Sequence, residues 1–439
     1  MRLKNTIIYI LLIFPYILDN ASKGRYWDQT FRFFPFPRSV YLLYPAFYTI
    51  ILIIILLNFL RSNKKLKPSP LFKIVLFAVL LSTLSALANG FTYVSILTIN
   101  KYYRMFFVYI ITYLFFAPSL FSIKRLNNIS IFFMVISLTI AWFQIIVLNA
   151  KVDYVTGLSS TAHVFVLVMI FFLIYLTNYF LSKKKYFKLI FTLPIIIALF
   201  MASFAKANII FIFSLVLYAL VILKKRINIA SVFKYTITGL LIISGFIFSL
   251  EILDKPTYNK LGLFINIRLS NVPYYNNIIN TPRLLTKNIK TIIFGYGPGN
   301  FGSRSNLEEG KIAVKEFNKL HHFTYNIDTF GLSPSMKNPT SAMLAFLLEN
   351  GLVIFLLYLY LLLFMYKKTI FIIRNNNGLI PTYLANSTLF VFLFFIIYNF
   401  IVPEHIFFIS NLFTGFIFMY LAIVHKRFDM LQQGIKSTI

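Results

Sequence analysis

The chain has 439 residues, of which 59% are hydrophobic and 19% aromatic, while only 12% are charged. Soluble domains are about one-quarter charged, so this composition excludes a soluble enzyme, a coiled coil and a disordered chain. The absence of cysteine excludes disulfides, thiolate metal sites and a cysteine nucleophile. We therefore expect an all-α polytopic integral membrane protein, and the formal net charge of +30 then needs an explanation within that class.

Apolar stretches long enough to cross a bilayer recur along nearly the whole chain. A membrane-spanning helix needs about 20 apolar residues. Twelve spans are predicted, at approximately 5–19, 39–60, 72–90, 103–122, 127–148, 161–181, 187–204, 207–223, 230–251, 341–366, 379–402 and 406–425. The chain thus divides into residues 1–251 with nine helices, a large loop at 252–340, and residues 341–439 with three helices and a tail.

Basic residues mark one side of the predicted membrane. If the N-terminus lies inside, the inner segments hold 23 of the 42 Lys and Arg residues and a single carboxylate, Asp429. Inner segments of membrane proteins are enriched in Lys and Arg, so both termini are predicted to be cytoplasmic. These basic residues are spread over seven short segments and form no single stripe, so we expect no nucleic-acid partner. An uncleaved first helix is expected, because no small-x-small cleavage site is convincing near its end.

The loop at 252–340 is the longest connection of the predicted topology, with 89 residues on the outer side. It holds eleven basic and five acidic residues. Two interpretations are open: long loops tolerate basic residues on the outer side, or an anionic ligand binds there. The basic residues placed to meet such an anion are Arg268 and Arg283 in the loop, and Arg104 and Lys206 at the outer ends of spans.

Two features stand out inside this loop. Residues 281–294 predict an amphipathic helix in which Arg283, Lys287 and Lys290 share one face. A glycine-rich stretch follows, and three glycines in five residues with a proline predict a tight turn whose backbone amides lie open to a ligand. It is not a P-loop, because no Gly-Lys-Ser/Thr follows. The turn residues are Gly295, Gly297, Gly299 and Asn300.

A carboxylate interrupts the tenth predicted span. Glu349 lies about eight residues into 341–366, which is roughly 12 Å along a helix. Burying a carboxylate at that depth is costly unless it faces a cavity or a partner. The alternative is that the helix proper starts near Gly351 and that Glu349 lies at the membrane interface.

Two stretches together resemble the bacterial O-antigen polymerase and O-antigen ligase superfamily. The first is the glycine-rich stretch 295–301, within the large late outer loop. The second is the return into the membrane, which reads Thr340-Ser341 and then, after seven apolar residues, Glu349-Asn350-Gly351. The resemblance implies a GT-C-type membrane fold with about twelve helices. It also implies a glycosyltransferase on the outer face of the bacterial inner membrane, using a polyprenyl-pyrophosphate-linked oligosaccharide as donor.

The resemblance also implies roles for individual residues. Departing pyrophosphate is an anion, so Arg268, Arg283, Lys206 and Arg104 are expected to bind it. The glycine turn with Thr340 and Ser341 is expected to contact the substrate. The implied partners are lipid-linked donor and acceptor oligosaccharides, membrane lipids and a chain-length regulator.

Within that superfamily the sequence favours the polymerase. Ligases tend to carry a His eleven positions before the Gly of this late span, and Thr340 occupies that position before Gly351 here. A general base must still take the proton from the acceptor hydroxyl, and His321, His322 and Glu349 are the candidates. An O-antigen ligase and a lipid-linked oligosaccharide flippase remain the alternatives. Because no Asp-x-Asp or His-x-x-x-His pattern occurs, we expect neither a metal nor another cofactor.

Overall fold

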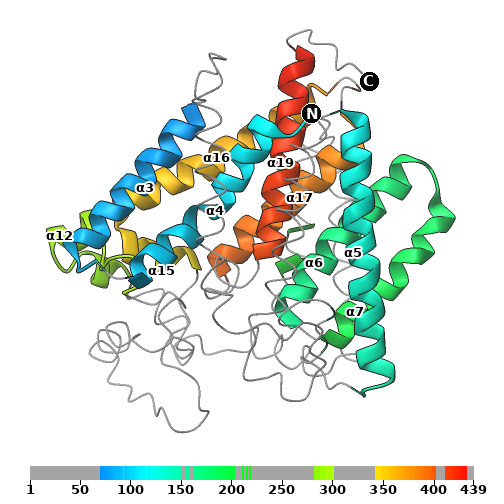
Figure 1. Ribbon diagram of the computed structural model, residues 1–439, viewed down its shortest axis with the longest axis horizontal. Helices are drawn as coiled ribbons and strands as arrows, with labels where there is room; N and C mark the ends of the chain where they lie inside the picture. Colours follow the sequence, from blue (N-terminus) through cyan, green and yellow to red (C-terminus); the bar gives the residue numbers. More distant parts are fainter. Residues whose placement is uncertain are drawn as a thin grey trace, which may run out of the picture.

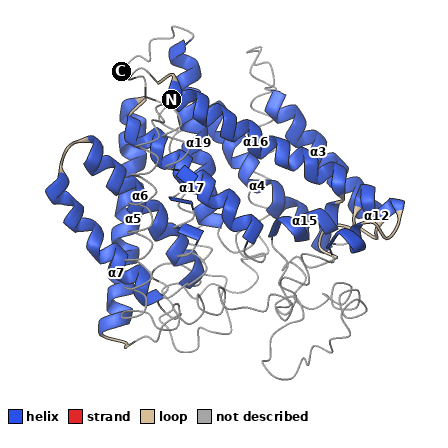
Figure 2. Ribbon diagram, turned by 180° about the vertical axis from the view of Figure 1, so that it is seen from behind, coloured by secondary structure: helices blue, strands red, loops and turns tan. Residues whose placement is uncertain are grey.

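The computed structural model describes residues 70–91, 93–117, 119–149, 155, 157, 162–202, 210–211, 214–215, 217–218, 281–300, 342–376, 378, 380–401 and 411–432. Within these ranges every regular element is a helix, as both views of the chain show (Figures 1 and 2). The helices are α3 Pro70–Ala88, α4 Tyr93–Phe115, α5 Leu120–Ile146, α6 Ala162–Ser182, the 3-10 helix η1 Tyr186–Thr192, α7 Leu193–Ala202, α12 Ile289–Phe294, α15 Ala342–Asn350, α16 Leu352–Arg374, α17 Thr382–Ile401 and α19 Asn411–Gln432.

Several of these helices have the length and apolarity of membrane spans. Five described segments qualify, namely Leu71–Ala88, Ser122–Ile146, Phe165–Ser182, Leu352–Arg374 and Thr382–Phe400. The prediction of an all-helical, multi-pass membrane protein is therefore confirmed for the described part of the chain. The predicted spans at 5–19, 39–60 and 230–251 lie outside the described residues, as do most of 207–223 and of the loop at 252–340.

The helix α4 starts ten residues before the span predicted at 103–122. Its first turns carry Ser95 and Thr98, which lower the local hydropathy, yet both side chains are buried inside the bundle. The helix ends at Phe115, three positions before Pro118. A proline disfavours helical geometry in the residue that precedes it, so helices usually end shortly before a proline. Ser119 then caps α5 by accepting a hydrogen bond from the backbone N–H of Ser122.

Two opposite ends of the bundle can be defined from contacts. At one end, Asp429 of α19 accepts a hydrogen bond from Tyr113 of α4 and forms an ion pair with Lys368 of α16. Tyr179 of α6 packs edge-on against Tyr383 of α17, which brings the end of α6 to the start of α17. We call this the basic end, because it carries Lys183, Lys184, Lys185, Lys367, Lys368, Arg374, Lys426 and Arg427.

The other end is formed by the last turn of α3, the first half of α4, α12, α15 and the start of α16. Ser85 of α3 hydrogen-bonds to the carbonyl of Phe294, and Tyr102 of α4 hydrogen-bonds to Glu349 of α15. We call this the glycine end, because Gly295, Gly297, Gly299 and Gly351 lie there. It corresponds to the side that the charge distribution predicts to be outside.

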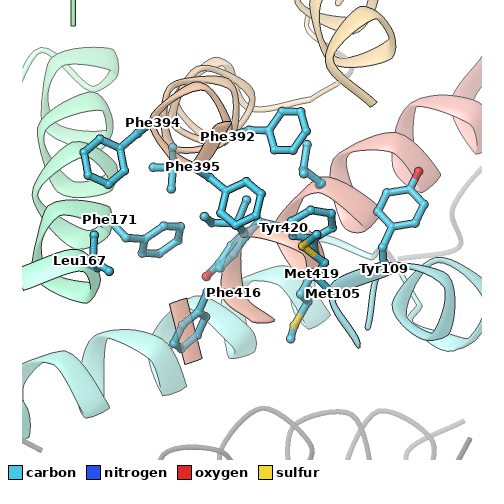
Figure 3. Packing of buried hydrophobic residues seen from close by; sticks show 14 of the residues in the cluster. Met105, Tyr109, Leu167, Phe171, Phe392, Phe394, Phe395, Phe416, Met419 and Tyr420 are labelled. Atoms are coloured by element: carbon cyan, nitrogen blue, oxygen red, sulfur yellow. The ribbon is translucent and has the colours of Figure 1, made fainter. Parts of the chain in front are cut away.

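Aromatic side chains hold the bundle together around α19 (Figure 3). Phe416 of α19 stacks on Phe171 of α6 at 5.7 Å between ring centroids. Phe418 packs edge-on against Phe395 of α17 at 5.4 Å and against Phe106 of α4 at 5.6 Å. Edge-to-face pairs of this kind add about 0.5–1.5 kcal/mol each beyond the area they bury. The helices α4, α6 and α17 are therefore fixed through α19.

The structure corrects two expectations about helix continuity. Residues 281–294 do not form one helix, because the first helical segment ends at Leu285 and Asn288 then caps α12 through a capping box with Thr291. The predicted span at 341–366 is broken at Gly351 into α15 and α16. Irregular backbone within a membrane protein is tolerated where other parts of the protein satisfy its polar groups. The groups that do so here form the candidate site.

Candidate functional site

The break between α15 and α16 depends on a glycine. Gly351 has φ of 82°, a left-handed conformation that side chains with a Cβ disfavour. The carbonyl of Ile293, at the end of α12, approaches Gly351 so closely that a Cβ there would lie 2.3 Å from its oxygen. Gly351 thus provides both the turn and the space that lets α12 reach the broken helix.

The glycine turn donates hydrogen bonds to the last carbonyl groups of α15. The last carbonyl groups of any helix lack partners within the helix. Here the N–H of Tyr296 donates to Leu348 O at 2.8 Å, and the N–H of Gly297 donates to Glu349 O at 2.9 Å. Gly295 has φ of 64°, and a Cβ on it would lie 2.5 Å from the backbone of Glu349. The turn can dock only because that Cβ is absent.

The side chain of Glu349 completes this attachment. Its Oε2 accepts a hydrogen bond from the Tyr102 hydroxyl at 2.8 Å and another from the N–H of Gly299 at 2.9 Å. Both Glu349 and Tyr102 are fully buried, with 0% of their surface exposed. Tyr102 also packs edge-on against Phe346 of α15 at 4.6 Å between ring centroids. One carboxylate oxygen therefore ties the glycine turn and α4 to α15.

The last turn of α3 holds the opposite side of the glycine turn. Ser85 donates to the carbonyl of Phe294, and the amide of Asn89 donates to Gly295 O at 3.3 Å. Asn300 donates in return to Asn89 O at 3.3 Å and to Tyr296 O at 3.2 Å. The glycine turn is thus enclosed between α3 and α15, and we call this arrangement the glycine clamp: Ser85, Asn89, Tyr102, residues 295–300 and residues 348–351.

This geometry corrects the expectation that the backbone amides of the turn lie open to a ligand. The N–H groups of residues 295, 296, 297, 299 and 300 all donate to oxygen atoms of the protein itself. Glycine is required at positions 295 and 351 because other backbone atoms approach them closely. The side chain of Asn300 donates hydrogen bonds to the carbonyl groups of Asn89 and Tyr296. The predicted role of Gly295, Gly297, Gly299 and Asn300 in substrate contact stays a prediction, and their observed contacts are structural.

The predicted cationic residues differ in their surroundings. Arg104 of α4 is buried, two positions beyond Tyr102, whereas Arg283 is exposed in the helical turn before α12. On a helix two positions correspond to 200° of rotation and about 3 Å of rise, so Arg104 lies at the level of the glycine clamp on the opposite face of α4. Six further candidates lie outside the described residues: Lys206, Arg268, His321, His322, Thr340 and Ser341.

Asn350 adds an unusual polar group beside Glu349. Its side chain is fully buried, and its Nδ2 donates to Phe346 O at 3.2 Å. Its Oδ1 finds no hydrogen-bond partner within the part of the chain that the structure describes.

Sequence reasoning missed three members of the glycine clamp, namely Ser85, Asn89 and Tyr102. A usable signal was present on α3, where Ser82, Ser85 and Asn89 follow one another at helical spacing in an otherwise apolar span. Ser82 also has a buried partner, the hydroxyl of Tyr103 at 2.8 Å. A polar stripe on a membrane helix indicates a face turned toward the protein interior. Tyr102 carried no such signal among the many aromatic residues of the chain.

The glycine clamp uses its backbone N–H groups and the Glu349 carboxylate to hold α4, α15 and the glycine turn together. Within the described ranges, no three His, Asp or Glu side chains are grouped so that they could hold a metal ion. Comparison of the chain with protein-family models and with curated proteins finds no match. The family resemblance therefore rests on the residues of 295–301 and 340–351 themselves.

Proposed function

We propose that the protein polymerises lipid-linked oligosaccharide repeat units of O-antigen or a related surface polysaccharide. One observation supports this proposal more than any other. The two segments that carry the family resemblance form a single hydrogen-bonded unit, although Gly299 and Glu349 are 50 positions apart. That unit lies at the glycine end, opposite the basic end, where a reaction on the outer face of the membrane would take place.

The proposed reaction joins two lipid-linked sugars. A hydroxyl of the acceptor sugar attacks the anomeric carbon of the donor, and a new glycosidic C–O bond forms. The bond between that carbon and the donor pyrophosphate breaks, so polyprenyl pyrophosphate leaves as an anion. The proton of the acceptor hydroxyl passes to a general base, for which His321 and His322 are the proposed residues. No oxidant or reductant is needed.

Arg104 is the described residue best suited to meet the leaving group. A guanidinium remains charged even where it is buried, and its fork can donate two hydrogen bonds to one phosphate. A buried charge in a membrane protein generally faces the interior or a polar cavity. Arg104 fulfils this condition at the level of the glycine clamp, and Arg268, Arg283 and Lys206 are proposed to complete the cationic site.

We assign Glu349 a positioning role within this reaction. A general base must lie within hydrogen-bonding reach of the proton it accepts. Glu349 is instead fully buried, and its Oε2 is occupied by Tyr102 and Gly299. Its carboxylate would hold the glycine turn, and through it the remainder of the loop, against α15. The candidate histidines follow that turn in the sequence.

The proposal is tested by the glycans of a strain that lacks the protein. A polymerase defect leaves single repeat units and removes long chains. A ligase defect removes all units from the acceptor lipid, and a flippase defect leaves lipid-linked units on the inner face. Either of the last two patterns would refute the proposal.

Complementation with variants then tests the proposed cationic site. Arg104→Gln, Arg268→Ala and Arg283→Ala are expected to lose long chains while the protein remains at normal abundance in the membrane. Lys124→Gln serves as a matched control, because Lys124 is an exposed cation on α5 at the basic end. Normal chain length in all three arginine variants would exclude these residues from pyrophosphate binding.

A further inference from the structure

The connection between α6 and α7 contains a backbone conformation that its sequence disfavours. Lys184 has φ of 54°, in the left-handed region. Its N–H donates to Leu181 O at 3.1 Å, while the N–H of Lys185 donates to Phe180 O at 2.9 Å. These two bonds define a Schellman motif, which ends many helices and usually has glycine at the left-handed position. A lysine in the left-handed region is less stable than a glycine would be. Its presence here therefore suggests that the lysine side chain has a function.

The same connection is strongly and uniformly charged. Lys183, Lys184, Lys185 and Lys188 are all exposed. The sequence has no Asp or Glu between Asp153 and Glu251, so no neighbouring carboxylate along the chain offsets these lysines. Lysines at a helix C-terminus also interact favourably with the helix dipole, but that effect is confined to the last turn and does not extend to Lys188.

Large aromatic side chains lie directly beside these lysines. In η1, Phe187 is 85% exposed, and Tyr186 and Phe191 are each 61% exposed. Phe187 and Ile190 are three residues apart in a 3-10 helix, so they lie on the same face. Exposed aromatic residues next to lysines are typical of segments that lie at the headgroup level of a bilayer. The position of η1 between the ends of two apolar helices, α6 and α7, places it at such a level.

We propose that residues 183–191 form a binding surface for anionic phospholipid headgroups at the basic end. The ammonium groups of Lys183, Lys184, Lys185 and Lys188 contact lipid phosphates, and the exposed rings of η1 enter the upper acyl region beneath them. Charge complementarity and adjacent apolar anchors favour an anionic lipid over a zwitterionic one. The surface is independent of the glycine clamp and of the proposed glycosyl transfer.

A single tryptophan at the segment can report on its lipid neighbours. The chain has two tryptophans, Trp27 and Trp142, so Trp27→Phe and Trp142→Phe remove the background fluorescence. Phe187→Trp then introduces one reporter at the most exposed ring of η1. The full-length protein is reconstituted in phosphatidylcholine bilayers that contain either brominated phosphatidylglycerol or brominated phosphatidylcholine as a minor component. Bromine quenches the tryptophan only when the labelled lipid is in contact.

We expect brominated phosphatidylglycerol to quench the reporter severalfold more than brominated phosphatidylcholine at low salt. Each Lys→Gln substitution at positions 183, 185 and 188 should lower this selectivity by up to about fivefold. Lys184→Gly should lower it similarly while it preserves the helix end, because glycine suits the left-handed position. The double variant Lys287→Gln and Lys290→Gln removes two exposed charges before and within α12 and should leave the selectivity unchanged.

Three results would overturn the proposal. Equal quenching by both lipids would show that the segment lies in the bilayer without preference for anionic headgroups. Absence of quenching by either lipid would show that η1 does not contact the bilayer. Loss of selectivity in the Lys287→Gln and Lys290→Gln variant would show that overall charge, and not this surface, attracts the lipid.

Discussion

The hydroxyl of Tyr102 donates a hydrogen bond of 2.8 Å to the carboxylate of Glu349, although 247 positions separate the two residues. The same carboxylate oxygen accepts the N–H of Gly299, so α4, α15 and the glycine turn meet at one atom. A buried polar group that loses a hydrogen-bond partner costs stability, because no water replaces that partner. The stability of the glycine end should therefore depend on this carboxylate and its two donors.

Tyr102→Phe removes one of these donors and keeps the aromatic ring. We expect the free energy of unfolding to fall by about 1–3 kcal/mol, because a buried acceptor loses a hydrogen bond. Denaturant unfolding in detergent micelles measures this change. Tyr360→Phe on α16 is the control, since Tyr360 is exposed and its substitution should change stability little. Equal stability of both variants would contradict the importance of the Tyr102 contact.

Glu349→Gln distinguishes a positioning carboxylate from a general base. Both hydrogen bonds end on Oε2, and an amide oxygen placed there can accept them both. We expect the glutamine variant to fold and to retain polymer synthesis. Glu349→Ala should instead lose about 3 kcal/mol or more, because two buried donors lose their acceptor. Loss of all polymer in a normally folded Glu349→Gln protein would identify Glu349 as the base and refute our assignment.

A glycine of the site and a glycine outside it should differ in their tolerance of a methyl group. Gly351 and Gly378 both have left-handed φ values, of 82° and 79°, so alanine is strained at either position by about 1–2 kcal/mol. A Cβ at Gly351 would also lie 2.3 Å from a carbonyl oxygen, whereas one at Gly378 would meet nothing within 4 Å. Gly351→Ala should therefore destabilise the protein by roughly 1–3 kcal/mol more than Gly378→Ala. Similar melting temperatures for the two variants would argue against the close approach of α12.

The polar cluster at the basic end predicts coupling between α4 and α19. Tyr113 donates to Asp429 at 2.6 Å, and Lys368 forms an ion pair with the same carboxylate. A double-mutant cycle of Tyr113→Phe and Asp429→Asn should give a coupling energy of about 1 kcal/mol, as is usual for residues in one network. Lys367→Met replaces the exposed neighbour of Lys368 and should show no coupling with Asp429→Asn. Strict additivity in the first cycle would contradict the network.

Reporter fusions test which side of the membrane each end occupies. A reporter that is active only outside the cytoplasm should be active after Asn300, at the glycine end. Fusions after Lys65 or Lys185 should be inactive, because both positions lie in predicted inner segments. Activity after Lys185 together with inactivity after Asn300 would reverse the topology and remove the basis for a reaction on the outer face.

Hydropathy alone located most of the described helices. A span must consist of about 20 mostly apolar residues that are consecutive in the chain, so it can be recognised from local composition. The helices α3, α6 and α17 lie within a few residues of the predicted spans. The start of α4 was missed because Ser95 and Thr98 are polar but buried against other helices. Burial of these side chains among other helices is a tertiary property that no window of sequence reveals.

The candidate site divides in the same way. The sequence by itself singled out the glycine-rich stretch at 295–301 and Glu349. Glycines lose more conformational entropy on folding than other residues, and a carboxylate in an apolar span is costly to bury, so both features indicate a structural or functional role. Only the tertiary structure decided that Gly295 and Gly351 permit backbone contact, and that Tyr102 and Gly299 share the carboxylate of Glu349. A sequence pattern shows that a polar group lies in an apolar segment and is therefore costly to bury. The partner that offsets that cost, 247 positions away in the case of Tyr102, is known only once the chain has folded.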